Sequence, residues 1–232
     1  MWESRVALPP ERRLAVLPLL DRATRRDATQ LAHRLIWTLF PGASDNRRDF
    51  LFLVERERPF IAIVRSARAP SEAGGLLVIE HSYAFAPRVH RGQRLRFRLK
   101  AVPATWTRTT ARAATKRQDV IMAAWQRLPE ADRADPERLE AVAEAAARTW
   151  LQRQGERRGF AFAEDQVEVL TYDRSRLPTG RPRQRIIFGA VTWEGVLEVR
   201  EVEVFRRTLG DGLGALRAFG HGLLQIAPLP GA

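Results

Sequence analysis

The chain has 232 residues, a formal net charge of +12 and an ordinary hydrophobic content, which suits one large or two small domains with a buried core. It contains no cysteine, which excludes disulfides and thiolate metal sites, and no apolar run of the ~20 residues that a membrane-spanning helix needs. The first residues lack the apolar core of a signal peptide, so we expect a cytoplasmic protein with no membrane partner.

Arginine dominates the positive charge, because all but two of the 39 basic residues are arginine. Its planar guanidinium binds phosphate through two parallel hydrogen bonds and stacks on bases, whereas lysine acts more like a point charge. A GC-rich genome also enriches arginine, but it explains neither the net charge nor its distribution along the chain. The composition therefore favours a polyanionic partner.

The first half of the sequence alternates between strand and helix patterns. The segment Asp27–Phe40 has apolar residues at helical spacing, a start that resembles a capping box, and Pro41 as its stop. The patterns predict a strand over 2–8, an irregular and partly helical connection over 11–26, a helix over 27–40, a hairpin of strands over 50–55 and 60–65, a loop or short helix over 67–75, and a strand over 76–83. This β-α-β-β-(α)-β order is that of a ferredoxin-like domain, which we assign to residues 1–88.

The second half repeats this order, and we assign it to a second domain, residues 92–232. Residues 94–100 alternate strictly between basic and apolar side chains, which predicts a strand with one buried face. The patterns predict a strand over 94–100, a polar loop over 104–117, helices over 118–128 and 136–158, strands over 166–173 and 185–192, a helix or alternatively a strand over 201–209, and a last strand over 223–226. The predicted fold class is α+β, with two tandem ferredoxin-like domains.

Two clusters of basic residues indicate where a polyanion binds. Between Glu80 and Asp119 there is no acidic residue, and the interval contains ten basic ones: Arg88, Arg91, Arg94, Arg96, Arg98, Lys100, Arg108, Arg112, Lys116 and Arg117. A second cluster occupies a predicted hairpin tip: Arg174, Arg176, Arg181, Arg183 and Arg185. Self-repulsion on this scale is unfavourable unless a polyanion neutralises it, so the pattern favours nucleic acid. Trp106 and Phe219 lie near these clusters, and each fits either base stacking or a core position.

A glycine-rich segment, Gly210–Pro228, precedes and includes the last predicted strand. Glycine permits a positive φ and a close approach of backbones, and the N–H groups of such a loop can receive phosphate, with Arg217 adding a charge. A tight turn before a core strand explains the same residues. The spacing matches neither a Walker A loop nor a Rossmann fingerprint.

Four histidines, His33, His81, His90 and His221, could act as acid or base near neutral pH. His33 lies on the polar face of the predicted helix, within two turns of its N-terminus, where phosphate binds favourably. A lone helix histidine is also often only structural. No pair of histidines has metal-ligand spacing, so we expect no metal site.

The pattern Gly212-Leu-Gly-Ala-Leu-Arg-Ala-Phe-Gly-His-Gly-Leu-Leu224 resembles the glycine-rich signature of the CRISPR-associated repeat-processing endoribonucleases of the CasE type, from type I-E systems. Further similarities follow in the same order and cover nearly the whole chain: Met1-Trp2, His33–Phe40, Asp49–Phe52, Gly92–Leu99, Pro103 and Lys116-Arg117. The resemblance implies two ferredoxin-like domains and no metal or other cofactor. It also implies partners: the CRISPR repeat stem-loop, which is cut once at its base, the mature guide RNA, and the other subunits of the surveillance complex.

The resemblance also implies the chemistry. A ribose 2′-OH attacks the adjacent phosphate and leaves a 2′,3′-cyclic phosphate and a 5′-OH, which requires a base, an acid and cations. His33 matches the family's active-site histidine, and Arg34 is an electrostatic candidate. Gln30 stands where some members have tyrosine, and no lysine matches a family lysine near the second-domain hairpin, so the second acid or base is unassigned. RNA contacts are expected from Arg26, Gln30, Arg94, Arg96, Arg98, Lys100, Lys116, Arg117, Arg174, Arg176, Arg181, Arg183, Arg185, Gly212, Gly214, Arg217, Gly220 and Gly222.

Two alternatives remain open at the level of sequence. One is a catalytically weak subunit that binds the repeat hairpin, because Gln30 replaces a possible catalytic partner. The other is a basic structural protein of a ribosome-like assembly, which explains the charge but not His33 together with the glycine-rich segment.

Replacing the five arginines of the 174–185 hairpin by alanine should weaken the salt dependence of RNA binding. Each phosphate contact that is lost makes the slope of log K against log salt less negative by roughly 0.7–0.9. Titrating the repeat hairpin RNA at several salt concentrations measures this slope. An unchanged slope would show that the hairpin makes no phosphate contacts.

Overall fold

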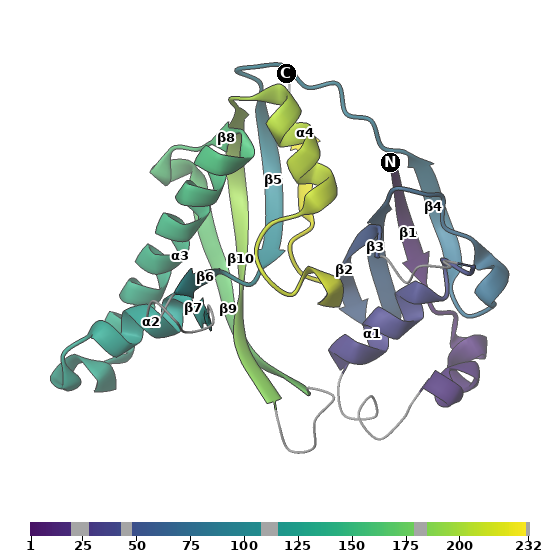
Figure 1. The fold of residues 1–232 in the computed structure, drawn as a ribbon, viewed down its shortest axis with the longest axis horizontal. Helices are drawn as coiled ribbons and strands as arrows, with labels where there is room; N and C mark the ends of the chain where they lie inside the picture. Colours follow the sequence, from purple (N-terminus) through teal and green to yellow (C-terminus); the bar gives the residue numbers. More distant parts are fainter. Residues whose placement is uncertain (20–27, 43–47, 108–115, 179–184, 231–232) are drawn as a thin grey trace.

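The computed structural model describes residues 1–19, 28–42, 48–107, 116–178 and 185–230. It shows a mixed α+β protein whose two halves lie side by side, each built on an antiparallel sheet (Figure 1). None of the described helices combines the length and the apolar character that crossing a lipid bilayer requires.

The first half contains β1 (Trp2–Ala7), η1 (Pro10–Leu19), α1 (Ala28–Trp37), β2 (Phe50–Glu57), β3 (Phe60–Ser66), η3 (Glu72–Gly74) and β4 (Val78–Ala84). Its four strands form one sheet in the order β2-β3-β1-β4, and every neighbouring pair is antiparallel. Helix α1 crosses in front of this sheet (Figure 1) and buries one apolar stripe against it. Leu35 and Ile36 from α1 join Val6, Phe52 and Val64 from the strands in the resulting core.

The second half contains β5 (Arg94–Ala101), β6 (Ala104–Thr107), β7 (Lys116–Asp119), α2 (Val120–Arg127), η4 (Glu130–Ala134), α3 (Pro136–Arg158), β8 (Phe160–Ala161), η5 (Glu164–Gln166), β9 (Val167–Pro178), β10 (Arg185–Val199), α4 (Val202–Asp211), η6 (Arg217–Phe219) and β11 (Leu224–Pro228). Strand β5 lies between β11 and β10, and both β9 and β8 pair with the other edge of β10. In each half, therefore, the first strand lies between the last strand and the strand that closes the hairpin.

The alternation predicted for β5 is confirmed. Leu95, Phe97 and Leu99 are buried in the second core, while the basic residues between them lie on the opposite face. Trp150 from α3 stacks on Trp193 from β10, with ring centroids 5.6 Å apart, and covers the apolar side of the sheet.

The predicted loop over 104–117 is wrong at both of its ends. Residues 104–107 and 116–119 pair as the antiparallel strands β6 and β7. Thr105, Trp106 and Thr107 are β-branched or aromatic, which suits a strand. Asp119 then caps α2 by accepting hydrogen bonds from the N–H groups of Ile121 and Met122. The segment over 201–209, for which a strand was an alternative, is helical.

Arg65 of β3 joins the two halves from a buried position, with 3% of its surface exposed. Its Nη1 donates hydrogen bonds to the carbonyl oxygens of Leu209 (3.0 Å) and Leu224 (2.9 Å) in the second half. Its Nε donates to the carboxylate of Glu3 at 2.9 Å, and its guanidinium lies 4.1 Å from the ring centroid of Phe85. The charge is thus paired on one side and hydrogen-bonded across the interface on the other.

Arg65→Ala should lower the free energy of unfolding by about 3–5 kcal/mol, because it leaves the Glu3 charge and two carbonyl groups without their partner. Urea unfolding followed by circular dichroism measures the change. Arg5→Ala is the matched control on the neighbouring strand. Its exposed pairs with Glu55 and Glu80 should contribute less than about 1 kcal/mol. Equal losses in the two variants would refute the role given to Arg65.

Candidate active site

His33 lies where the first helix meets the glycine-rich segment of the second half. Its half-buried ring makes two hydrogen bonds: Nδ1 to the carbonyl oxygen of Ala218 at 2.5 Å, and Nε2 to the indole Nε1 of Trp37 at 3.0 Å. Because the carbonyl can only accept and the indole can only donate, Nδ1 carries the proton and Nε2 is the acceptor. The ring of Phe219 lies 5.1 Å away, centroid to centroid.

The surroundings of His33 favour its neutral form. Burial lowers its pKa below the usual 6.5, as do the positive charges of Arg48 and Arg34, while the hydrogen bond to Ala218 opposes the shift. Burial also lowers the pKa of Arg48, as does the nearby charge of Arg217. Arg34 and Arg48 therefore lie close to a neutral imidazole, and Arg217 of the second half lies near Arg48.

Arg48 has an unused hydrogen-bond donor. Its Nη1 is buried and, among the residues that the structure describes, has no hydrogen-bond partner. Arg217 is held from the other side, since its Nη1 donates to the carbonyl oxygen of Asp211 at 2.7 Å. A buried donor beside a second guanidinium is unfavourable unless an anion accepts from it.

The glycines of the Gly210–Pro228 segment allow it to dock on the first half. A Cβ on Gly212 would lie 2.7 Å from the carbonyl oxygen of Gly222 and 2.9 Å from a methyl group of Leu51 on β2. A Cβ on Gly220 would lie 3.0 Å from the ring of Phe52, also on β2. Both glycines have positive φ, so a side chain would be strained there as well as too close. This close approach places η6 against α1 and brings Ala218 to His33.

Burial of these glycines bears on their predicted RNA contacts. Gly212, Gly220 and Gly222 are buried, and Gly214 is half-buried, so packing within the protein accounts for their residue type. Their contact with RNA stays a prediction.

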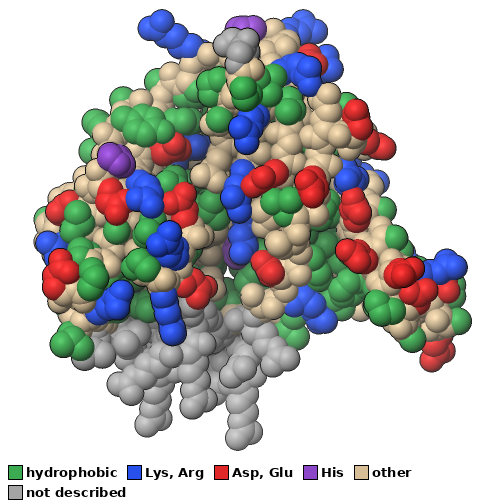
Figure 2. Space-filling model, turned by 180° about the vertical axis from the view of Figure 1, so that it is seen from behind, with side chains coloured by type: hydrophobic (Ala, Val, Ile, Leu, Met, Phe, Trp, Pro, Cys, Tyr) green, Lys and Arg blue, Asp and Glu red, His purple; other side chains and the backbone are tan. Residues whose placement is uncertain are grey.

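The basic face of β5 carries less free charge than the sequence indicates. Arg98 pairs with Glu194 of β10 at 3.2 Å, and Lys100 pairs with Asp173 of β9 at 3.4 Å. Arg94 Nη2 donates to the side-chain oxygen of Gln166 at 2.8 Å. Seen from behind, the middle of the molecule shows a row of basic side chains flanked by acidic ones (Figure 2). The run without acids is therefore compensated by strands that lie later in the sequence.

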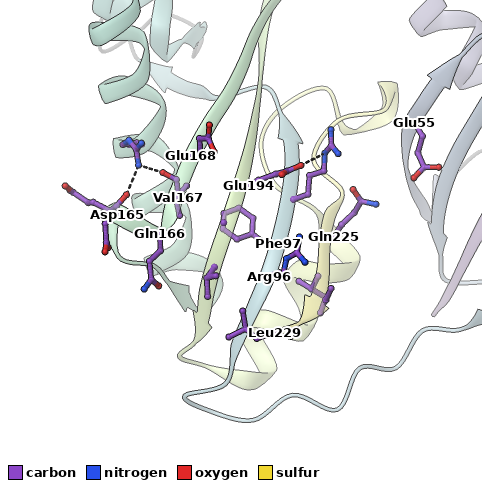
Figure 3. A pocket seen from close by; sticks show the side chains of 17 residues that line it. Glu55, Arg96, Phe97, Asp165, Gln166, Val167, Glu168, Glu194, Gln225 and Leu229 are labelled. Carbon is purple, nitrogen blue, oxygen red and sulfur yellow. Dashed lines mark hydrogen bonds and ion pairs between the residues drawn. The ribbon is translucent and has the colours of Figure 1, made fainter. Parts of the chain in front are cut away.

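A groove of about 1030 Å³ runs along this face and is lined from β5, β10, β11 and η5, with Glu55 of β2 on its far side (Figure 3). Its charged lining is mixed, because Arg96 and Arg98 line it together with Glu168 and Glu194. The described residues around His33 do not line it, so the groove and the histidine site are separate features.

The structure describes some of the remaining residues that were predicted to contact RNA, and others lie outside the described ranges. Gln30 and Arg34 lie on α1, on either side of His33 in sequence, Arg174 is exposed on β9, and Arg117 is half-buried on β7. Arg26, Arg181 and Arg183 lie outside the described residues. For three further residues the structure describes only the strand on which each lies: β7 for Lys116, β9 for Arg176 and β10 for Arg185.

Sequence reasoning placed Trp37 on the same helix face as His33 but gave neither Trp37 nor Arg48 a role in the site. Trp37 lies one helical turn after His33, and this i, i+4 spacing was a usable signal for a contact. Arg48 precedes β2 without any local pattern, so only the tertiary packing of the first half shows its place near His33. Phe219, which fitted either stacking on a base or a core position, packs against the His33 ring.

No group of three or more histidine or acidic side chains in the described part of the chain is arranged to hold a metal ion. His81 and His90 are exposed, and His221 is buried within the glycine-rich segment with its ring 5.4 Å from that of Phe188. His33 is thus the histidine with both a half-exposed ring and surrounding cations.

The chain is similar to known proteins over almost its whole length. A family model described as CRISPR associated protein matches residues 1–228, so the chain belongs to this family of CRISPR-associated proteins. Its relatives narrow the assignment to the Cse3/CasE (Cas6e) family of type I-E systems.

Three relatives illustrate the similarity. The Cascade subunit CasE of Escherichia coli K12 is 29% identical over 215 residues, 91% of this chain and 97% of that protein. The CRISPR-associated endoribonuclease Cse3 of Thermus thermophilus is 27% identical and covers 98% of this chain and 100% of that protein. The structure of Thermus thermophilus Cse3 bound to an RNA representing a pre-cleavage complex superposes with a TM-score of 0.65, at 28% identity and 98% coverage of each chain.

Buried His221 should make folding sensitive to acid. Burial is the largest cause that lowers its pKa, to about 4, and the charge of Lys100 adds to this effect. The unfolded chain takes up this proton near pH 6.5, whereas the folded protein takes it up only near pH 4. The contribution of His221 to the free energy of unfolding is therefore fully present above pH 6.5. It is lost as the pH drops toward 4, which lowers the free energy of unfolding by up to about 3 kcal/mol.

Urea unfolding between pH 7.5 and pH 4.5 measures this loss. His221→Leu should show a shallower fall in stability over the same range, because it has no proton to take up. An identical pH dependence in the variant would show that another group causes the loss.

Proposed function

We propose that this protein is a metal-independent endoribonuclease that binds the stem-loop of CRISPR repeat RNA and cuts it once at the base of the stem. The observation that carries the proposal is a neutral histidine, His33, held at the junction of the two halves among Arg34, Arg48 and Arg217. A neutral imidazole can exchange a proton at pH 7, and the guanidinium groups can stabilise a phosphate that gains negative charge.

In the proposed reaction, one phosphorus atom of the RNA exchanges its bond to a 5′-oxygen for a bond to the neighbouring 2′-oxygen. The 2′-OH upstream of the cut loses its proton, its oxygen bonds to the adjacent phosphorus, and the bond from phosphorus to the 5′-oxygen breaks. The products carry a 2′,3′-cyclic phosphate and a 5′-OH, and the leaving oxygen takes its proton from water. His33 exchanges the proton at the reacting ribose, and Gln30 has no side-chain group that ionises in the neutral range.

The arginines have a separate task in this reaction. The phosphorane that forms during attack carries more negative charge on its oxygens than the starting phosphodiester. The unused Nη1 of Arg48 can donate to one of these oxygens, and Arg34 and Arg217 add positive charge nearby. Groups that are already oriented toward developing charge lower the barrier because they need not reorganise.

We infer that the product stays bound as the guide RNA of the type I-E surveillance complex, in the cytoplasm. The relative from Escherichia coli is a subunit of Cascade, and the relative from Thermus thermophilus has been observed bound to an RNA that represents a pre-cleavage complex. The arginine-rich hairpin of β9 and β10 is suited to enter a stem at its end, since the A-form major groove is deep and narrow.

We also propose that the two halves are ferredoxin-like domains, residues 1–88 and 92–232. The shared strand order of the two sheets supports this assignment. Phe85 and Val89 near the boundary pack in the second core, so the connecting segment belongs structurally to both halves.

The first test is cleavage of the repeat hairpin RNA in EDTA. The unmodified protein should cut, and a 2′-deoxy substitution just upstream of the cut should abolish cutting. His33→Ala should reduce the rate by about 100- to 10,000-fold and leave RNA affinity within a few fold. His81→Ala, an exposed histidine on β4, is the control. Binding without cutting by the unmodified protein would favour a subunit that only binds the hairpin, and a requirement for metal would overturn the mechanism.

The second test addresses Arg48. Arg48→Ala should slow cleavage by about 100-fold, the effect of removing one donor to a developing oxyanion, with a small change in affinity. Arg48→Lys should recover part of the rate, because it keeps the charge but not the fork of donors. Arg206→Ala on α4 is the control, since that arginine pairs with Glu203 at the surface. Full activity of Arg48→Ala would exclude Arg48 from the reaction.

A further inference from the structure

Trp37 occupies the one nitrogen of His33 that catalysis needs. The carbonyl of Ala218 holds Nδ1, and the indole N–H of Trp37 donates to Nε2 at 3.0 Å. Both ring nitrogens are therefore engaged within the protein when RNA is absent. A proton can reach or leave His33 at Nε2 only when the Trp37 hydrogen bond gives way.

The direction of this hydrogen bond distinguishes between the two roles open to His33. Nε2 accepts a hydrogen bond from Trp37. While Nε2 stays unprotonated, only another hydrogen-bond donor can replace Trp37 there. A ribose 2′-OH is such a donor. The oxygen of a leaving phosphate ester is an acceptor and would require a proton on Nε2 first. The contact thus prepares His33 to act as the base.

The position of Trp37 is built into the fold. It lies one turn after His33 on α1, and its ring packs edge-on against Phe50 of β2 with centroids 5.0 Å apart. Phe50 in turn stacks on Phe40 at 4.9 Å. Phe219 lies on the His33 ring itself, so aromatic groups restrain the ring and its donor together.

We propose that Trp37 is the positioning residue of this site: its indole N–H keeps Nε2 of His33 unprotonated and oriented, and the 2′-OH of the bound RNA displaces it. This inference rests on the proposed function. Nε2 then accepts the 2′-OH proton as the 2′-oxygen bonds to phosphorus. The bond to the 5′-oxygen breaks, that oxygen takes a proton from water, and the imidazolium keeps its Nδ1–H bond to Ala218.

The charges near His33 act in the same sense as Trp37. Arg34 on α1 and Arg48 before β2 both lower its pKa, and Arg217 on η6 lies near Arg48. Loss of the indole donor removes one stabilising contact of the neutral form while these charges remain. The pKa of His33 should therefore rise without reaching that of a solvated histidine.

The experiment is Trp37→Phe, which keeps an aromatic ring and removes the donor. In RNA-free protein, a titration of the histidine ring by NMR should show the pKa of His33 raised by about 0.5–1 unit, the equivalent of one hydrogen bond. The acid limb of the pH profile of kcat/KM reports the pKa of the base in the free enzyme, so it should move to higher pH by the same amount. The acid limb of kcat should stay in place, because bound RNA has already displaced Trp37.

Trp125→Phe is the matched control, because it removes an indole N–H that donates to the carbonyl of Leu139 at 2.8 Å, away from the site. Trp125→Phe should change neither the pKa of His33 nor the position of the acid limbs of kcat/KM and kcat. In the unmodified protein, the indole N–H signal of Trp37 should follow the titration of His33 while that of Trp125 does not, which tests the contact even if Trp37→Phe folds poorly.

An unchanged His33 pKa in Trp37→Phe, or an equal shift of both limbs, would overturn the proposal. The titration uses no RNA, so it judges the Trp37 contact independently of cleavage. Failure of the unmodified protein to cut would instead count against the proposed function.

Discussion

The buried guanidinium of Arg65 connects the two halves that together form the histidine site. It neutralises Glu3 within the first sheet and donates to two backbone carbonyls at the end of α4 and in β11. A buried charge is tolerated only when it is paired and hydrogen-bonded, so these partners restrict how the halves can sit together. The glycines of the Gly210–Pro228 segment then allow its backbone to approach β2 closely.

The site is composite as a consequence. His33 comes from the first helix, and the carbonyl that orients it lies 185 residues later in the chain. The cations likewise come from both halves, since Arg48 precedes β2 and Arg217 begins η6. An imidazole kept neutral among guanidinium groups differs from a histidine paired with a carboxylate, whose pKa would rise. The arrangement suits a reaction in which a neutral base takes a proton while a nearby phosphate gains charge.

Charge distribution shows where reading along the chain is misleading. The interval between Glu80 and Asp119 contains only basic charges, yet Arg98 and Lys100 meet acids from β10 and β9. Sheet pairing places residues almost a hundred positions apart side by side, and no local window detects this. The open face of the second sheet is therefore of mixed charge.

The amino-acid sequence by itself determined the mixed α+β class, most strands and helices, the burial pattern of β5 and the position of His33 on a helix, because these depend on periodicity over a few residues. The β6–β7 pair was missed because each strand has only four residues and β7 consists of polar and charged residues. The glycines were recognisable, but their use in packing was not. Only the tertiary structure decided the Arg65 connection, the proximity of Arg48 to His33 and the hydrogen bond from His33 to Ala218, because these contacts depend on how segments separated in the sequence pack together.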